Sequence, residues 1–314
     1  MTKALITGAA GYVGGRLVQS LTGAGWEVHA LARESADRLH VPQTVCDLAN
    51  ADAVPALARA CEGVDTVVHL AGENESLAAR QPAAALAGTL VSTERVSEAC
   101  ATAGVKRLIY MSTVHVYGAR MTPGATLTED MRVEPRSAYA ISRLASEHVA
   151  AALAGAYELV ILRLTNSVGA PDAACVDRWT LVANDLCRQG ALTGRLQLLS
   201  SGTQWRDFVS LSAVCSAITE ACQGQDSSLA PGTYNLGSGV PRTVRDLAEM
   251  IQDTFERETG RRPPLQAPEP EVDPPGPYNV SVQRALSGGL RLDTPLQDAV
   301  TETVRFCLDH REEL

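Results

Sequence analysis

A glycine pattern near the amino terminus constrains the fold more than any other feature of this chain. In "LITGAAGYVGGRL", Gly8, Gly11 and Gly14 follow a short apolar run and open an amphipathic stretch. Glycines at this spacing let the backbone approach phosphate groups, and the amides at the start of the next helix face negative charge. Glycines that merely close a turn would look the same, but the strand–turn–helix context favours a pyrophosphate site.

Short β-rich runs alternate with helical stretches up to about residue 167, which predicts an α/β fold: a Rossmann-type, doubly wound parallel sheet. The expected strands are 3–7, 26–31, 44–46, 65–70, 106–112 and 158–164, and the expected helices are 11–24, 51–62, 80–103 and 137–154. Later helices are expected at 181–190, 212–223, 243–256 and 296–309. We therefore expect a dinucleotide-binding domain at 1–168 and a smaller substrate-binding lobe at 169–314, of which about 206–230 packs back on the first domain.

The overall charge and the cysteine pattern exclude several classes of protein. A net charge of -9 argues against a nucleic-acid-binding surface, which needs clustered Lys and Arg. No apolar stretch approaches the ~18 residues that a membrane span needs, and the glycines interrupt any signal peptide, so we expect a cytoplasmic protein. The eight cysteines include no C-x-x-C pair, which predicts buried, reduced thiols and no metal site.

The end of the second predicted strand bears on the choice of dinucleotide. An NAD site normally carries an acidic residue there for the ribose hydroxyls, but this chain has Ala32 followed by Arg33. With Ala32 at the acidic position there is no carboxylate there to repel a 2′-phosphate, and Arg33 can pair with one, so we expect NADP(H) in preference to NAD(H). The alternative is that Arg33 is only a solvated loop charge.

The stretch "SAYAISR" at 137–143 places Tyr139 and Arg143 four residues apart on one helix face. A free tyrosine has a pKa of ~10 and is a poor base near neutrality, so it needs a cation to stabilise its phenolate. A unit charge ~4 Å away contributes about 4 kcal/mol at an effective dielectric constant of ~20. The pair therefore predicts a general acid/base with an electrostatic partner.

Taken together, the motifs resemble the extended short-chain dehydrogenase/reductase family of NAD(P)-dependent nucleotide-sugar epimerases, dehydratases and ketoreductases. The likeness runs over almost the whole chain. The matching pieces are "TGAAGYVGG", "CDL" at 46–48, "VVHLAG" at 67–72, "MSTVHVYG" at 111–118, "PRSAYAISR" at 135–143, "LRLTNSVGAP" at 162–171, "QWRDFV" at 204–209 and "TYNLGSG" at 233–239.

The resemblance implies a role for each matching position. Thr113 and Tyr139 would act on the reacting sugar oxygen, and Arg143 stands where relatives carry lysine. The implied cofactor contacts are Gly8, Gly11, Tyr12, Val13, Gly14, Arg33, Asp47, Leu48, Leu70, Ala71, Tyr139 and Arg143. The implied contacts to a nucleoside-diphosphate sugar are Thr113, His115, Asn166 and Arg206. We also expect a homodimer.

Departures from the family pattern indicate which of the family's reactions to expect. Val114 and His115 replace the Asp-Glu pair of the 4,6-dehydratases, so we expect hydride transfer at a hexose carbon, C4, without elimination of water. Because NADP(H) is the expected cofactor, ketoreduction is slightly favoured over epimerisation. Arg143, together with Ala85 where relatives carry Asn, keeps an alternative open: a catalytically impaired sensor of dinucleotides or sugar nucleotides. The intact Thr113 and Tyr139 pair favours the enzyme.

Overall fold

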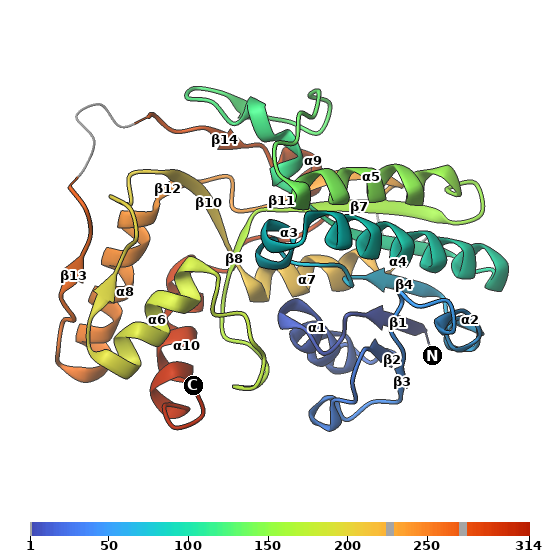
Figure 1. Ribbon diagram of the computed structural model, residues 1–314, viewed down its shortest axis with the longest axis horizontal. Coiled ribbons are helices and arrows are strands. Elements are labelled where there is room, and N and C mark those ends of the chain that lie inside the picture. Colours follow the sequence, from blue (N-terminus) through green and yellow to red (C-terminus); the bar gives the residue numbers. More distant parts are fainter. Residues whose placement is uncertain (1, 224–228, 270–274) are drawn as a thin grey trace.

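A seven-stranded parallel sheet forms the centre of the computed structural model, which describes residues 2–223, 229–269 and 275–314 (Figure 1). In spatial order its strands are β11 (Gly232–Leu236), β7 (Glu158–Leu164), β5 (Arg107–Thr113), β4 (Thr66–His69), β1 (Lys3–Thr7), β2 (Glu27–Ala32) and β3 (Gln43–Val45). The six predicted strands are present, each within one residue of its predicted ends. The Rossmann-type fold is confirmed, and β11 is a strand that the sequence analysis did not propose.

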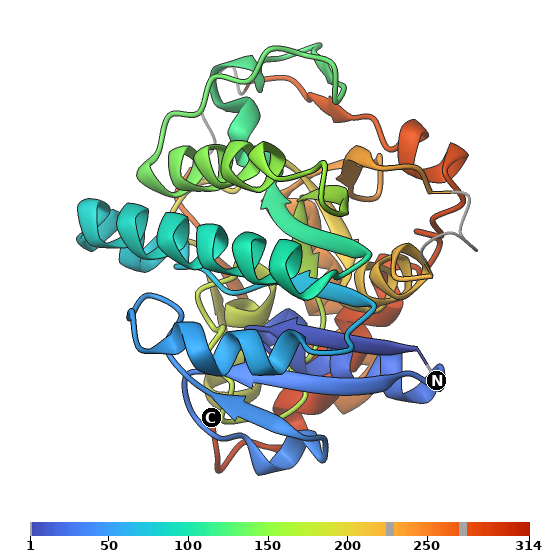
Figure 2. The same cartoon turned by 90° about the vertical axis from the view of Figure 1, so that its right-hand side faces the viewer.

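Helices cover both faces of this sheet, as the alternating side chains of the strands require. One face carries α2 (Ala53–Cys61), α4 (Pro82–Ala103) and α5 (Ala138–Ala152), and the other carries α1 (Tyr12–Gly23) and α7 (Leu211–Ala221). Within β1, Leu5 is buried in the core on the α2 side, whereas Ala4 and Ile6 belong to the core on the α1 side. Figure 2 shows α4 and α5 running side by side along the sheet.

A second lobe, on the left in Figure 1, is built around three packed helices: α6 (Val182–Thr193), α8 (Val244–Thr259) and α10 (Leu296–Asp309). A three-stranded sheet of β12 (Pro241–Thr243), β10 (Trp205–Ser210) and β8 (Asn166–Val168) adjoins them. Two small strand pairs are also present: β13 (Leu265–Gln266) with β9 (Leu196–Gln197), and β14 (Asn279–Val280) with β6 (Thr126–Leu127). The short helix α9 (Gln283–Ser287) packs near β11.

Two elements from the second half of the chain lie with the large sheet. Helix α7 packs on α1, and β11 extends the sheet beside β7. The division into lobes at residues 168 and 169, with 206–230 packing back, stays a proposal.

The cysteines and the helices bear on the remaining expectations from composition. All eight thiols are free; Cys175 is exposed and Cys46 is partly exposed, so the thiols are not uniformly buried. In the described ranges, no helix is both long enough and apolar enough to cross a bilayer.

Candidate active site

The glycine-rich turn connects β1 to α1 and lies against the end of β4. Gly8 has φ +69°, and a Cβ there would lie 2.9 Å from the backbone nitrogen of Ala71, so only glycine fits this crossing without strain. Gly11 is the N-cap of α1, and the first turn of that helix, which includes Val13 and Gly14, contains no acidic residue. The free amides of this turn can therefore face an anion, and the turn fits the pyrophosphate of a dinucleotide.

Other predicted cofactor residues surround this turn. Leu70 donates its amide to the carbonyl of Thr7, which keeps the segment after β4 beside the turn. The buried phenol of Tyr12 donates to the carbonyl of Gly169 at 2.8 Å, so this side chain ties the turn to the second half of the chain. Only the backbone of Tyr12 is left to contact a phosphate.

Asp47 and Leu48 follow β3. The Asp47 carboxylate accepts hydrogen bonds from the Ala49 amide at 3.0 Å and from Asn50 at 3.2 Å. Leu48 is buried, and its carbonyl accepts from Arg95 at 2.6 Å. Both side chains are thus held close to the turn that follows the strand.

Arg33 lies just beyond β2 with 71% of its side chain exposed. Its Nη1 is 3.6 Å from Glu73 Oε1, a surface ion pair that contributes little. A second arginine, Arg38, was not singled out from the sequence: it binds Asp172 at 2.8 Å and the carbonyl of Ala10 at 2.8 Å. Its position is set by folding around the glycine-rich turn, and no short motif marks it.

Thr113 and Tyr139 lie where the catalytic chemistry was expected. Thr113 is the last residue of β5, and its Oγ1 accepts the amide hydrogen of His115 at 3.2 Å. Tyr139 is in the first turn of α5, whose N-cap Ser137 accepts from the Ala140 amide at 3.2 Å. The cap fixes where the helix begins and therefore where the phenol lies.

Arg143 is almost fully buried and adjoins Tyr139, with its guanidinium carbon 5.4 Å from the centre of the ring. It donates to the carbonyls of Met111 at 3.4 Å and Glu73 at 3.3 Å, and its Nε has no hydrogen-bond partner among the described residues. A Cβ on Gly72, which has φ +151°, would lie 2.8 Å from Arg143 Nη1. The arginine is accommodated because this position is glycine.

The charge of Arg143 has no buried carboxylate to balance it: in the described ranges none lies within ion-pair distance. Burial raises the pKa of the partly exposed Tyr139 phenol above its ordinary value, and Arg143 lowers it by a smaller amount. The pKa of the Tyr139 phenol is therefore raised overall, although the charge of Arg143 by itself would lower it. Tyr139 is therefore protonated at neutral pH.

Ala85 lies buried in the first turn of α4. One turn later, the Thr89 hydroxyl accepts the amide of Glu73 at 3.2 Å, and the Thr89 carbonyl accepts from Thr93 at 2.8 Å and Ser146 at 3.5 Å. Threonine and serine side chains thus join α4 to the site without an asparagine at position 85.

A cavity of about 180 Å³ opens beside the phenol and is lined in part by Tyr139, His115 and Glu75. Glu75 begins the short helix α3 (Glu75–Arg80) and binds Arg178 at 2.9 Å, which joins the two halves of the chain across the site. Burial lowers the pKa of His115, so the imidazole is neutral at pH 7. Neither Glu75 nor Arg178 was singled out from the sequence.

Asn166 and Arg206 lie on adjacent strands, β8 and β10. Asn166 donates to the Asp207 carbonyl at 3.0 Å, and Arg206 donates to the Trp205 carbonyl at 2.9 Å. The Asp207 carboxylate instead accepts from the amides of Ser238 and Gly239, at 2.8 and 2.7 Å. Arg206 is therefore not neutralised by its acidic neighbour, as a phosphate-binding residue requires.

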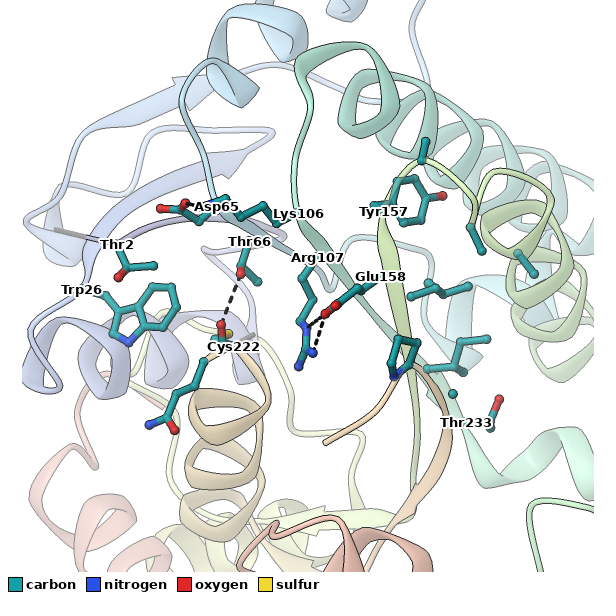
Figure 3. A pocket seen from close by; sticks show the side chains of 18 of the residues that line it. Thr2, Trp26, Asp65, Thr66, Lys106, Arg107, Tyr157, Glu158, Cys222 and Thr233 are labelled. Carbon is teal, nitrogen blue, oxygen red and sulfur yellow. Dashed lines mark hydrogen bonds and ion pairs between the residues drawn. The ribbon is translucent and has the colours of Figure 1, made fainter. Parts of the chain in front are cut away.

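A second cavity lies elsewhere, at the amino ends of the strands (Figure 3). It measures about 1280 Å³, and Arg107 and Glu158 on its wall bind each other at 2.6 Å. Asp65 and Lys106 are paired as well, at 2.7 Å. None of the sequence-predicted site residues lines this cavity.

Comparison with known proteins agrees with this geometry. The sequence pattern of the NAD dependent epimerase/dehydratase family matches residues 4–237. The chain belongs to this family. Its members act on nucleotide sugars as NAD-dependent epimerases, dehydratases and reductases.

Two curated family members are similar over most of their length. A UDP-glucose 4-epimerase of Azospirillum brasilense is 30% identical over 84% of this chain and 83% of the relative. A dTDP-6-deoxy-L-talose 4-dehydrogenase (NAD(P)(+)) of Kitasatospora kifunensis is 34% identical over 79% of this chain and 78% of the relative. Among solved structures, MoeE5 in complex with UDP-glucose and NAD is 25% identical, covers 99% of both chains and has a TM-score of 0.81. None of these family members is described as a sensor.

Proposed function

We propose that this family member transfers hydride at C4 of a hexose in a nucleoside-diphosphate sugar, with Thr113 and Tyr139 acting on the C4 oxygen. The main support for this proposal is the hydrogen bonding of the Thr113 hydroxyl. Its oxygen already accepts the His115 amide, and within the described ranges no residue accepts its hydrogen, which is therefore available to a substrate oxygen. When bound, the dinucleotide would donate or accept the hydride.

Reduction of a 4-keto sugar is the favoured direction. A protonated Tyr139 can give its proton to the oxygen as the ketone is reduced, and the raised pKa of this phenol keeps it protonated at neutral pH. The similarity to a 4-dehydrogenase also supports oxidation and reduction at this carbon. Arg143 then stabilises the phenolate that proton transfer leaves behind.

Epimerisation at C4 is a second candidate, because the similarity to a UDP-glucose 4-epimerase covers 84% of this chain. Dehydration is not favoured, since Val114 and His115 follow Thr113 in place of the Asp-Glu pair of the 4,6-dehydratases.

The dinucleotide is proposed to bind at the glycine-rich turn, with NADPH preferred to NADH. The exposed Arg33 guanidinium and the apolar Ala32 suit a 2′-phosphate. Asn166 and Arg206 are proposed to bind the substrate's diphosphate, because the Arg206 fork has no carboxylate partner within the described ranges. The homodimer expected from the sequence belongs to this proposal and is tested by light scattering.

The test is a panel of nucleoside-diphosphate hexoses and their 4-keto derivatives, incubated with purified protein and NADPH or NADH. Consumption of NADPH with a 4-keto sugar, together with a hydroxyl product at C4, supports ketoreduction. Interconversion of two hexoses without net change in dinucleotide absorbance supports epimerisation instead. No turnover with any member of the panel would refute the proposal.

A further inference from the structure

A buried ion pair lies next to the residues proposed to do the chemistry. Glu147 and Arg163 are 4% and 6% exposed. Arg163 donates to both carboxylate oxygens of Glu147, at 3.0 and 2.7 Å, and the hydroxyl of Ser112 donates to the same carboxylate. This bidentate arrangement fixes direction as well as distance, unlike an apolar contact.

The pair connects the elements that carry the two reacting side chains. Glu147 is on α5, two helical turns after Tyr139 and on the same face. Ser112 directly precedes Thr113 in β5, and Arg163 lies beside Ser112 in β7. The Glu147 carboxylate therefore links the helix of the phenol to the strand of the hydroxyl, in addition to the bond from Arg143 to the Met111 carbonyl.

The network continues toward the substrate side of the molecule. Arg163 Nη1 donates to the Tyr117 hydroxyl at 3.2 Å, and that hydroxyl donates to Asn235 at 2.7 Å. The Asn235 amide then donates to the carbonyls of Leu127 and Ser281, at 3.2 and 3.0 Å. These carbonyls belong to the β6–β14 region, so the segment that follows Thr113 is held by the same chain of bonds.

A buried ion pair is weak evidence for stability, because removing two charges from water offsets much of their attraction. What the bidentate bonds add is a fixed geometry between α5, β5 and β7. Strands β5 and β7 are joined at their amino ends by a second ion pair, Arg107 with Glu158 (Figure 3). Thr113 is at the other end of β5. Two ion pairs of this chain can therefore be compared. Glu147 pairs with Arg163 near the catalytic residues, and Arg107 pairs with Glu158 at the opposite end of β5 and β7.

We propose that Glu147 is a positioning residue, which sets the separation between the Thr113 hydroxyl and the Tyr139 phenol. It does not touch the substrate and acts through Ser112, Arg163 and its own helix. The inference rests on the proposed function, because that separation matters only if both groups act on one oxygen.

The test compares Glu147→Gln with the control Glu158→Gln, which removes the charge of the more exposed carboxylate that pairs with Arg107, in the intact protein. A misplacement of ~1 Å can lower a rate by ~100-fold, so Glu147→Gln is expected to lower kcat by about 10- to 100-fold. KM for the sugar nucleotide and Kd for NADPH should stay near the parent values. Glu158→Gln should keep kcat near the parent value even where both variants melt at lower temperatures.

Ser112→Ala serves if Glu147→Gln does not fold, since it removes one bond to the carboxylate and leaves the ion pair. A several-fold loss of kcat with unchanged KM is expected. A crystal structure of either variant should show the Thr113 and Tyr139 oxygens moved relative to each other.

Parental kcat in both Glu147→Gln and Ser112→Ala would overturn the inference, as would an equal loss of kcat in Glu158→Gln. Tyr139→Phe in the same assay keeps the two proposals apart. Parental turnover of Tyr139→Phe refutes the proposed function, whereas an inactive Tyr139→Phe beside a fully active Glu147→Gln refutes only the positioning role.

Discussion

Removing the charge of Arg143 should change how turnover depends on pH. The guanidinium carbon is 5.4 Å from the centre of the Tyr139 ring; Arg143 is buried, and Tyr139 is partly exposed. With the phenolate charge placed at the ring centre and an effective dielectric constant of ~20, the attraction is about 3 kcal/mol. Arg143→Met should therefore disfavour the phenolate by about 100-fold.

The direction in which the pH profile shifts depends on whether the sugar is oxidised or reduced. Oxidation of the sugar needs the phenolate as a base, so its rate rises with pH up to the pKa of Tyr139. That pKa is already raised by burial, and loss of Arg143 raises it further. The rising part of the profile should move to higher pH, and the oxidative rate at neutral pH should fall by about 100-fold.

The assay is kcat/KM for the oxidative reaction, followed by NADPH absorbance across the pH range in which the protein stays folded. Arg143→Lys is the control, because it keeps the charge, and its activity should be maintained or raised. An Arg143→Met variant with the parental rate and pH profile would show that the arginine does not act on the phenol. His115, whose ring centre is 6.3 Å from that of Tyr139, would then be the next group to test as the proton acceptor.

Four further substitutions test other parts of the account. Tyr139→Phe should lower kcat by about 10²- to 10⁴-fold while calorimetry shows unchanged cofactor affinity; an active variant would contradict the acid/base role. Arg33→Ala should erase most of the preference for NADPH, worth ~1.5–3 kcal/mol, and tighter NADH binding by the parent protein would be evidence against it. Arg206→Ala should weaken sugar-nucleotide binding and leave dinucleotide binding nearly unchanged, whereas equal loss of both would indicate a role in folding. Gly72→Ala should lower kcat more in the parent than in an Arg143→Met background, because the added Cβ would meet the guanidinium; equal losses in both would exclude that clash.

Local patterns were enough to predict the large sheet. Each strand of the first half combines an apolar run with a turn or helix signal after it, so β1 and β7 match their predicted ends. Strand β11 was missed because it has only five residues, and its pairing with β7 is what gives it a place in the sheet. Long-range pairing of this kind leaves no periodicity in the sequence.

The candidate site divides in the same way. Tyr139 and Arg143 could be paired from their spacing on one helix, but the burial that raises the pKa of the phenol depends on several elements packing together. The partners of Arg143, two main-chain carbonyls and the open space at Gly72, come from segments distant in sequence. The sequence therefore predicts which groups can react, whereas the fold determines the pKa of the phenol and the contacts of Arg143.

Transfer of deuterium shows directly whether hydride moves to C4 of the hexose and whether Tyr139 is needed for this step. The protein would be incubated with a 4-keto nucleoside-diphosphate hexose and NADPH carrying deuterium at the transferable position, and the product examined by NMR. We expect deuterium bonded to C4 of a hexose with a C4 hydroxyl, and at least about 100-fold slower formation of this product by Tyr139→Phe. Deuterium at another carbon, or labelled C4 product from Tyr139→Phe at the parental rate, would contradict this expectation.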